Sequence, residues 1–395
     1  MSVQVLIAGG GIGGLAAALA LTRGGHRVRL FEQAPQWGEL GAGVQLGPNA
    51  TRLFADWGLA TRLKDIAAAP CQVTVRRMKD GAALARMRLG ETMRARYGAP
   101  YFTVHRGDLH ALLLQAARSA GAALQLDRRI AQVEASAESV QVRFEAGEPA
   151  EGEVLVGADG VWSRVREQLL HDGMALPTGH LAYRAMVPQT GLPATLRSRD
   201  VAVWLGAKAH VVAYPVRRGE WLNVVAFIEG ERPGAAQDWD QQAHSPELLA
   251  GLGRVAPDLA ALVQAPSAWR LWSLHDRPPL QGAAQMARGR VALLGDAAHP
   301  MLPYLAQGAA MALEDAAELA TAMKSLQRPG DGAAAALQAY AQRRWARCAR
   351  VQRRARRNGA IFHAMGPVRW SRDLSLRLLG ERLLDVPWLY EGGAG

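Results

Sequence analysis

Short apolar runs bounded by glycine recur along the chain and predict buried strands. They cover residues 3–7, 154–157 and 291–294. Helical spacing follows two of them, because alanine and leucine dominate residues 15–22 and apolar positions recur every three or four residues from 308 to 319. This alternation of strand and helix predicts an α/β fold.

The middle of the chain, from residue 179 to about 272, has a different pattern. Strand-like runs follow one another without helices between them, and turn signals separate them, most clearly at Gly219 and Glu220. We expect an antiparallel sheet here that interrupts the α/β part, and an arginine-rich helical segment from residue 337 onward. The predicted strands are residues 180–187, 201–205, 210–216 and 221–228.

A glycine-rich turn joins the first predicted strand to the first predicted helix. It reads Gly9-x-Gly11-x-x-Gly14, and glycine there permits a tight turn and lets the backbone approach a pyrophosphate at a helix N-terminus. The strand at residues 26–31 leads into Glu32, 18 positions after Gly14 (32 minus 14), where an acid can hold ribose hydroxyls. The pattern predicts an adenine dinucleotide without a 2′-phosphate, and a plain βαβ unit is the alternative. NAD and FAD share this fingerprint.

A second strand–loop–helix unit contains further candidate ligand-binding residues. Asp296 lies just past the strand at residues 291–294, and Gly308 and Ala309 begin a helix whose first N–H groups have no partner inside that helix. The loop between them contains Pro303, which makes the connection rigid. We expect this unit to hold the electron-rich edge of a ligand; the alternative is an ordinary crossover.

Composition limits the protein class. A chain of 395 residues with 49% hydrophobic content can bury a large core and is expected to form two or three interleaved domains. The apolar start is interrupted by glycines, and no later run reaches membrane-spanning length. Cys71 and Cys348 lie far apart and form no metal-like pair, so we expect reduced thiols in a cytoplasmic protein without a metal site.

The net charge of +11 raises the question of nucleic-acid binding. Much of the basic excess lies in residues 343–357, where eight arginines alternate with apolar residues at helical spacing. A solvated helix face, a dimer surface or an acidic-ligand surface explains this segment equally well. No nucleic-acid module or row of stacking aromatics accompanies it, and we expect no nucleic-acid partner.

Three further segments complete a recognisable order of motifs. They are a Gly-rich loop at residues 39–45, a strand that leads into Arg106, and a buried strand that ends near Asp159. With the two strand–loop–helix units, this order resembles the single-component FAD-dependent aromatic hydroxylases of the p-hydroxybenzoate hydroxylase class. Within it, the chain is similar to the group of salicylate 1-hydroxylase, 3-hydroxybenzoate 6-hydroxylase and 6-hydroxynicotinate 3-monooxygenase.

The resemblance implies non-covalent FAD, NAD(P)H as a transient reductant and O₂ as co-substrate. Asp296 would bind the ribityl chain of the flavin, the N–H of Ala309 would face its pyrimidine edge, and main chain near Ile130 would hold the adenine. No second dinucleotide fingerprint is present for NAD(P)H, so we expect transient docking. The implied cofactor-binding residues are Gly9, Gly11, Gly13, Gly14, Glu32, Gln33, Val44, Arg106, Ile130, Asp159, Asp296, Gly308 and Ala309.

The resemblance also implies the domain organisation. A Rossmann-like FAD-binding domain would be interleaved with a mainly antiparallel substrate domain and followed by a C-terminal helical segment. The FAD-binding parts would comprise residues 1–75, 101–175 and 281–345, the substrate side would comprise 76–100 and 176–280, and the helical segment would comprise 346–395.

His210 and Tyr214 are the candidate catalytic pair. Strand alternation places His210, Val212 and Tyr214 on one face of the predicted sheet. A histidine on a strand is more often structural, but the matching positions in two of the resembled enzymes are also His and Tyr. We therefore expect His210 with Tyr214 to draw off a substrate hydroxyl proton, the Pro303 carbonyl to accept from that hydroxyl, and Gln45 to contact the substrate.

The implied reaction is hydroxylation of a small phenolic or hydroxypyridine carboxylate through a flavin C4a-hydroperoxide, with or without decarboxylation. Two of the resembled enzymes differ from this chain, one at the position of Pro303 and the other at that of Gln45, which leaves the substrate open. The alternatives are a reductase or dehydrogenase of the same fold and a basic protein that retains FAD structurally. We expect a monomer or homodimer.

Overall fold

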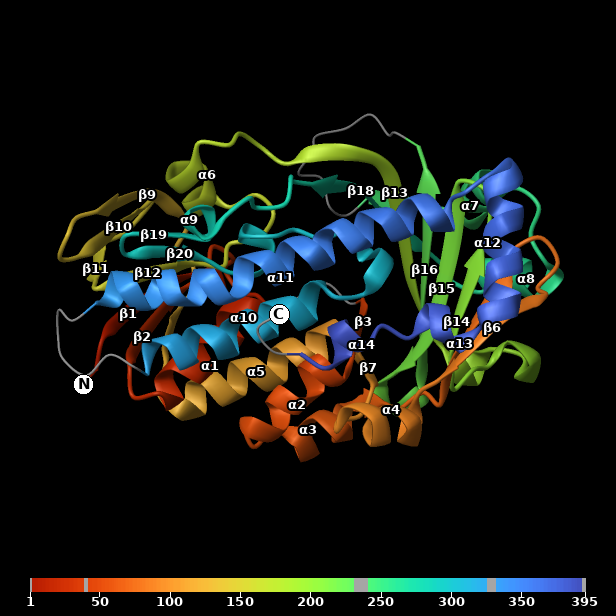
Figure 1. The fold of residues 1–395 in the computed structure, drawn as a ribbon, viewed down its shortest axis with the longest axis horizontal. Helices are drawn as coiled ribbons and strands as arrows, with labels where there is room; N and C mark the ends of the chain where they lie inside the picture. The colour runs from red at the N-terminus through yellow and green to blue at the C-terminus, as the bar shows by residue number, and fades with distance from the viewer. Residues whose placement is uncertain (1, 39–41, 231–240, 325–331, 393–395) are drawn as a thin grey trace.

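The computed structural model describes residues 2–38, 42–230, 241–324 and 332–392. Two halves lie side by side along the long axis of the molecule, one built on a mainly parallel sheet and the other on an antiparallel sheet (Figure 1). Helix α11 (Ala333–Phe362), which is 30 residues long, runs along both halves (Figure 1). The boundary expected at 345/346 therefore falls inside one continuous helix.

A mainly parallel sheet forms the core of the first half. Helix α1 (Ile12–Arg23) packs against α5 (Arg106–Ala120) and α10 (Gly308–Met323), and its small alanine side chains let the helix backbones approach closely. The predicted alternation of strand and helix is confirmed. The strand order in the described residues is β19 (Ala287–Arg288), β20 (Val291–Leu293), β12 (Val154–Gly157), β1 (Gln4–Ala8), β2 (Arg27–Phe31) and β8 (Ala123–Gln125).

The antiparallel sheet of the second half contains all four strands that the sequence predicted for residues 180–228. Sequence reasoning did not predict β18 or the hairpin of β5 and β6, and β5 joins this sheet by pairing parallel to β14. The domain boundary expected between residues 75 and 76 falls inside β5. The boundary expected between residues 175 and 176 lies at the start of β13. The order is β17 (Gln241–Ala243), β18 (Trp269–Asp276), β13 (Leu176–Pro188), β16 (Trp221–Glu229), β15 (Ala209–Val216), β14 (Val201–Leu205), β5 (Gln72–Arg77) and β6 (Ala83–Arg88).

Smaller elements complete the fold. The Gly-rich loop expected at residues 39–45 lies partly outside the described residues, and its later part forms β3 (Gly43–Leu46), which pairs antiparallel with β7 (Phe102–His105). The other small strands are β4 (Ala67–Ala68), β9 (Ile130–Ala135), β10 (Val140–Phe144) and β11 (Ala150–Gly152). The remaining helices are α2 (Pro48–Asp56), α3 (Ala60–Ile66), α4 (Gly90–Tyr97), α6 (Arg164–Leu170), α7 (Ser245–Leu252), α8 (Pro257–Gln264), α9 (Ala283–Met286), α12 (Gly366–Leu379), α13 (Glu381–Leu384) and α14 (Pro387–Tyr390).

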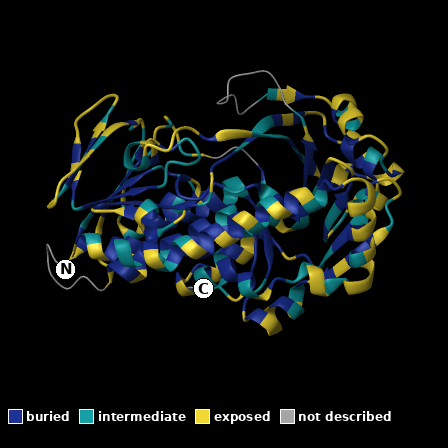
Figure 2. Ribbon diagram, turned by 45° about the horizontal axis from the view of Figure 1, so that its top comes forward, coloured by how far each residue is buried: buried dark blue, intermediate teal, exposed yellow. Residues whose placement is uncertain are grey.

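Buried residues concentrate in the interior of both halves, and exposed residues lie on the outer helices and hairpins (Figure 2). Helix α10 is buried over most of its length, from Ala310 to Met323. None of the helices in the described part of the chain is both long and apolar enough to cross a membrane.

A buried ionic network fixes α10 against α11. The Asp315 carboxylate accepts hydrogen bonds from the Gly295 N–H at 3.0 Å and the Arg344 Nε–H at 2.8 Å, and it lies 2.6 Å from His299 Nε2. Arg344 and Arg347 also pair with Glu314 at 2.7 Å. Part of the basic segment therefore neutralises acids inside the protein, a role that was not among the alternatives considered from the sequence.

Candidate functional site

A cavity of about 1150 Å³ lies between the two halves. One wall is made by the loops at the carboxyl ends of the parallel strands, the usual ligand position in an α/β sheet. The other wall is the facing side of β13, β15, β16 and β18. This volume exceeds that of a typical small-molecule pocket, so it can hold a large flat group together with a small ligand.

The glycine-rich turn forms one end of the cavity, where Gly11 and Gly13 line it at the start of α1. Gly9 has φ +99°, and a Cβ there would lie 2.4 Å from the Ala158 carbonyl oxygen. A Cβ on Gly14 would lie 2.0 Å from the carbonyl oxygen of Gly9. Neither position accepts a side chain, because the backbone packs tightly within this turn and against Ala158. Gly9 and Gly14 thus fix the shape of the turn, and Gly11 and Gly13 face the cavity.

Glu32 holds this turn in place. Its carboxylate accepts hydrogen bonds from the Gly10 N–H at 2.6 Å and from the Ala34 N–H at 2.8 Å. Glu32 does not line the cavity, although the next residue, Gln33, does. Contact between Glu32 and a ribose stays a prediction.

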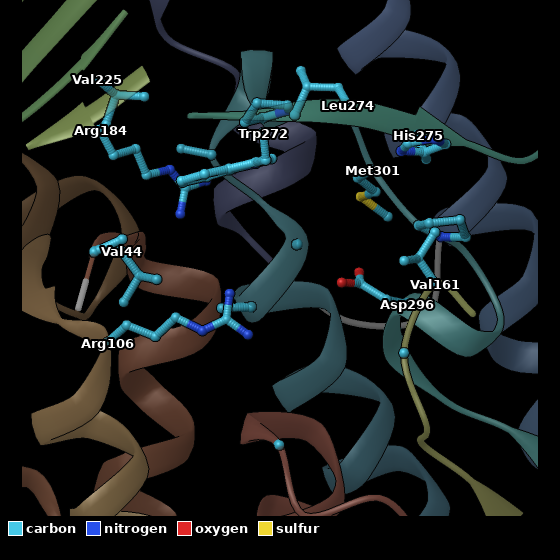
Figure 3. A pocket seen from close by; sticks show the side chains of 18 of the residues that line it. Val44, Arg106, Val161, Arg184, Val225, Trp272, Leu274, His275, Asp296 and Met301 are labelled. Carbon is cyan, nitrogen blue, oxygen red and sulfur yellow. The ribbon is translucent and has the colours of Figure 1, made fainter. Parts of the chain in front are cut away.

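The second strand–loop–helix unit contributes the opposite end of this wall. Asp296, Pro303, Gly308 and Ala309 all line the cavity, so the N-terminus of α10 opens into it as expected. Figure 3 shows the side chains of Asp296 and Arg106 directed into the same space from different elements. Two helix N-termini and an arginine form a cradle for an anionic, electron-rich group, which is the chemistry that a flavin dinucleotide presents.

Besides Gly9, Gly14 and Glu32, two more of the predicted cofactor-binding residues lie outside the cavity lining. Asp159 does not line the cavity; its carboxylate accepts from the N–H groups of Arg164 and Val165 at 2.8 and 3.1 Å and so caps α6. Ile130, at the start of β9, is buried and also lies outside the cavity lining. Ala158 and Gly160, the neighbours of Asp159, do line the cavity. Contact between Asp159 or Ile130 and the cofactor stays a prediction.

Of the predicted substrate residues, Tyr214 lines the cavity from the sheet wall, and Gln45 and Pro303 line it from the other wall. Val44, predicted to bind the cofactor, also lines the cavity. The Tyr101 hydroxyl donates to Gln45 Oε1 at 2.6 Å, which fixes the amide. Burial raises the pKa of Tyr214, so its phenol stays protonated and can act as a hydrogen-bond donor at neutral pH.

His210 lies behind the cavity lining, which corrects the expectation that it points openly at the ligand. Its ring stacks on Phe227 with 4.6 Å between ring centroids, and Phe227 itself lines the cavity. Its Nδ1 lies 2.8 Å from Nε2 of His363. Burial lowers the pKa of His210 well below its ordinary value, and His363, His180 and Arg372 add to the effect, so the ring is neutral.

Sequence reasoning missed Arg184 and Trp272, which line the sheet wall together (Figure 3). The signal for Arg184 was available, because a lone charge interrupts the apolar run from Leu181 to Val187. Trp272 belongs to β18, which was not predicted, and the pairing of β18 with β13 brings it beside Arg184. Met301 and His275 line the cavity from the loop before α10 and from the end of β18.

The chain belongs to the FAD binding domain family, which matches residues 2–355. It is 39% identical over 397 residues to a 3-hydroxybenzoate 6-hydroxylase of Polaromonas naphthalenivorans (strain CJ2), covering 100% of this chain and 97% of that protein. It is 38% identical to a 6-hydroxynicotinate 3-monooxygenase of Bordetella bronchiseptica (strain ATCC BAA-588 / NCTC 13252 / RB50), covering 89% and 90%.

The fold matches a solved salicylate hydroxylase substrate complex with a TM-score of 0.84 and 26% identity, covering 100% of this chain and 96% of that one. The comparisons confirm the class that the motifs predicted: an FAD-dependent monooxygenase that uses NAD(P)H and O₂.

The glycine-rich turn generates a prediction about FAD. Gly9→Ala should lose most of its FAD, because the new Cβ strains a positive φ, meets the Ala158 carbonyl and so displaces the turn whose Gly11 and Gly13 line the cavity. The melting temperature shows whether the variant is folded. Gly25→Ala is a matched control, since Gly25 also has a positive φ, +88°, but nothing lies within 4 Å of a Cβ there.

Flavin absorbance per protein and chromatography of the acid-released cofactor measure both variants. Equal FAD content in Gly9→Ala and Gly25→Ala would contradict the placement of the pyrophosphate at this turn, and released FMN would contradict the dinucleotide assignment.

Proposed function

We propose that this protein uses NAD(P)H and O₂ to hydroxylate a small phenolic or hydroxypyridine carboxylate. The single observation that carries the proposal is the cavity itself, which places two helix N-termini opposite a mostly apolar sheet face that carries Arg184 and Tyr214. Bound FAD, once reduced, supplies the O₂-activating chemistry. The chain must then position the ring, draw off its hydroxyl proton and exclude water.

We assign removal of the hydroxyl proton to His210, although this residue lies behind the cavity lining, because of the groups that contact it. His363 Nδ1 lies 3.6 Å from a Glu229 carboxylate oxygen, too far for a hydrogen bond, and has no hydrogen-bond partner in the described part of the chain. We place the proton of neutral His363 on Nδ1, on the side of the Glu229 carboxylate, which leaves Nε2 as an acceptor for the His210 Nδ1–H. His210 Nε2 then carries a lone pair and can act as a general base.

This arrangement avoids a buried imidazolium. Burial lowers the pKa of His363 to about 4, and His180 and Arg372 add to the effect, so a positive charge on either ring is unfavourable. A proton taken up at His210 Nε2 can be matched by transfer from His210 Nδ1 to His363 Nε2 over 2.8 Å. Transfer onward from His363 Nδ1 requires the Glu229 carboxylate to approach from its distance of 3.6 Å. Glu229 is partly exposed, so the proton leaves to solvent while both rings stay neutral.

Apolar side chains that line the cavity exclude water from the reaction site. Phe227 and Trp272 on the sheet, with Met301 and Pro303 on the loop before α10, surround the space between the two walls. An apolar enclosure protects the reactive state of the cofactor from unproductive breakdown to hydrogen peroxide. Pro303 lines this space, and we assign the hydrogen bond from the substrate hydroxyl to its carbonyl.

Oxygen uptake with NADH and NADPH, combined with product analysis, tests the function across hydroxybenzoates and hydroxynicotinates. We expect at least one acid to give hydroxylated product in near-stoichiometric amount with the pyridine nucleotide consumed. Consumption without hydroxylated product for every acid would favour the reductase alternative, and no consumption at all would favour a protein that retains FAD structurally.

The relay generates a separate prediction. His210→Ala should retain FAD and NADH oxidation while hydroxylation falls by about 10²–10⁴-fold and hydrogen peroxide is released, because flavin reduction needs no base. His363→Ala should show the same uncoupling to a smaller extent. His171→Ala, at an exposed histidine away from the cavity, is the matched control.

Hydroxylated product per NADH and the melting temperature together decide the outcome. A purely structural His210 would instead lower stability by roughly 1–3 kcal/mol and reduce both activities in parallel. Full coupling in both variants would remove His210 and His363 from the mechanism.

A further inference from the structure

Arg184 lies in the middle of the sheet wall, on β13, directly opposite Val225 of β16. Val225 pairs in turn with Val212 of β15, so the three residues form one row across the sheet, and all three line the cavity. Figure 3 shows the guanidinium of Arg184 extending into the cavity beside Trp272, on the far side from Asp296.

The guanidinium is held by stacking. Its Cζ lies 4.1 Å from the centroid of the Trp272 ring, a distance typical of a strong cation–π contact. Stacking occupies the flat face of the guanidinium and leaves its N–H edge for a ligand. Arg184 Nε is buried and has no hydrogen-bond partner in the described part of the chain.

The missing partner distinguishes Arg184, a partly exposed residue whose Nε atom is buried, from three buried arginines. Arg166 pairs with Asp172 at 2.6 Å, and Arg344 and Arg347 pair with Glu314 at 2.7 Å. No acid among the described residues forms an ion pair with Arg184. A desolvated charge without a counter-ion is unfavourable unless a ligand supplies one.

The Arg184 guanidinium stays protonated at neutral pH. Burial lowers the pKa of Arg184 to about 10, Tyr214 opposes this shift and Arg106 adds to it. An anion bound to Arg184 inside the cavity would raise the pKa of Arg184 again and offset the repulsion between Arg184 and Arg106. The site is therefore suited to a group that carries negative charge at neutral pH.

The lateral spacing fits a small aromatic acid. Strands β13 and β15 flank β16, and neighbouring strands lie about 5 Å apart. His210 is two residues along β15 from Val212, the residue in line with Arg184, so the backbones of Arg184 and His210 lie roughly 12 Å apart. Between them, Val225 and Phe227 of β16 offer an apolar floor for one ring. A ring over this floor can direct one substituent toward β13 and another toward β15.

We propose that Arg184, held by Trp272, binds the carboxylate of the aromatic substrate and so turns the substrate hydroxyl toward β15. This inference rests on the proposed hydroxylation of an aromatic acid. A carboxylate matches the planar edge of a guanidinium with two parallel hydrogen bonds, which gives orientation as well as affinity. Arg184 thus determines specificity for acids over neutral phenols.

The test compares 3-hydroxybenzoate with 3-hydroxybenzamide, which has the same ring and hydroxyl but no charge. Dissociation constants are measured on the FAD-loaded protein from the change in flavin absorbance. Wild-type protein should prefer the acid, and Arg184→Met should weaken acid binding by about 10- to 100-fold while amide binding changes little. Arg184→Lys should recover part of the preference because it restores the charge without the planar edge.

Arg88→Met is the matched control, since Arg88 is an exposed arginine on β6 of the same sheet and its loss changes the net charge equally. Trp272→Phe should weaken acid binding less than Arg184→Met. FAD content and the rate of flavin reduction by NADH show whether each variant is folded.

An equal loss of affinity for acid and amide in Arg184→Met would contradict the proposal. An unchanged preference for the acid in Arg184→Met, combined with a raised KM for NADH, would also contradict it. That result would indicate that Arg184 binds NADH and not the aromatic substrate. The proposed function is judged separately by product formation in wild-type protein, so it can fail while the acid preference of Arg184 stands, and the reverse also holds.

Discussion

The Asp315 carboxylate is the contact on which the geometry of the site depends. It is fully buried and bonds to the Gly295 N–H just after β20, to His299 in the following loop and to Arg344 of α11. Although burial alone would raise the pKa of Asp315, His299 and Arg344 hold it well below the ordinary value. Removing one member of such a network leaves an uncompensated buried charge, which typically costs about 3–5 kcal/mol.

This network explains how the loop between β20 and α10 holds Asp296 at the cavity between the two halves. Gly295 and His299 are bonded to Asp315, so Asp296 between them is held facing the cavity, and the same helix that carries Asp315 opens with Gly308 and Ala309. The long helix α11 supplies Arg344 to this network and, just past its C-terminal end, His363 to the group behind His210. One helix thus connects the cofactor wall with the sheet wall.

Much of this arrangement could be predicted from local sequence. The glycine turn, the strands around it and the start of α10 follow from spacing and periodicity, and Tyr214, Gln45 and Asp296 reach the cavity as expected. Arg184 could not be assigned in this way, because its partner Trp272 comes from β18, which is far along the chain and whose strand character was not recognised. The role of Asp315 could not be recognised from the sequence, because its three partners converge only in the folded protein.

The central claim is that the sheet wall orients an aromatic acid between a cation on β13 and a base on β15. A crystal structure of the FAD-loaded protein with bound 3-hydroxybenzoate tests it most directly. The account predicts the carboxylate in hydrogen-bonding contact with the Arg184 guanidinium, the ring over Val225 and Phe227, and the hydroxyl directed toward Tyr214 and His210. A carboxylate directed away from Arg184, with the hydroxyl on the β13 side, would contradict it.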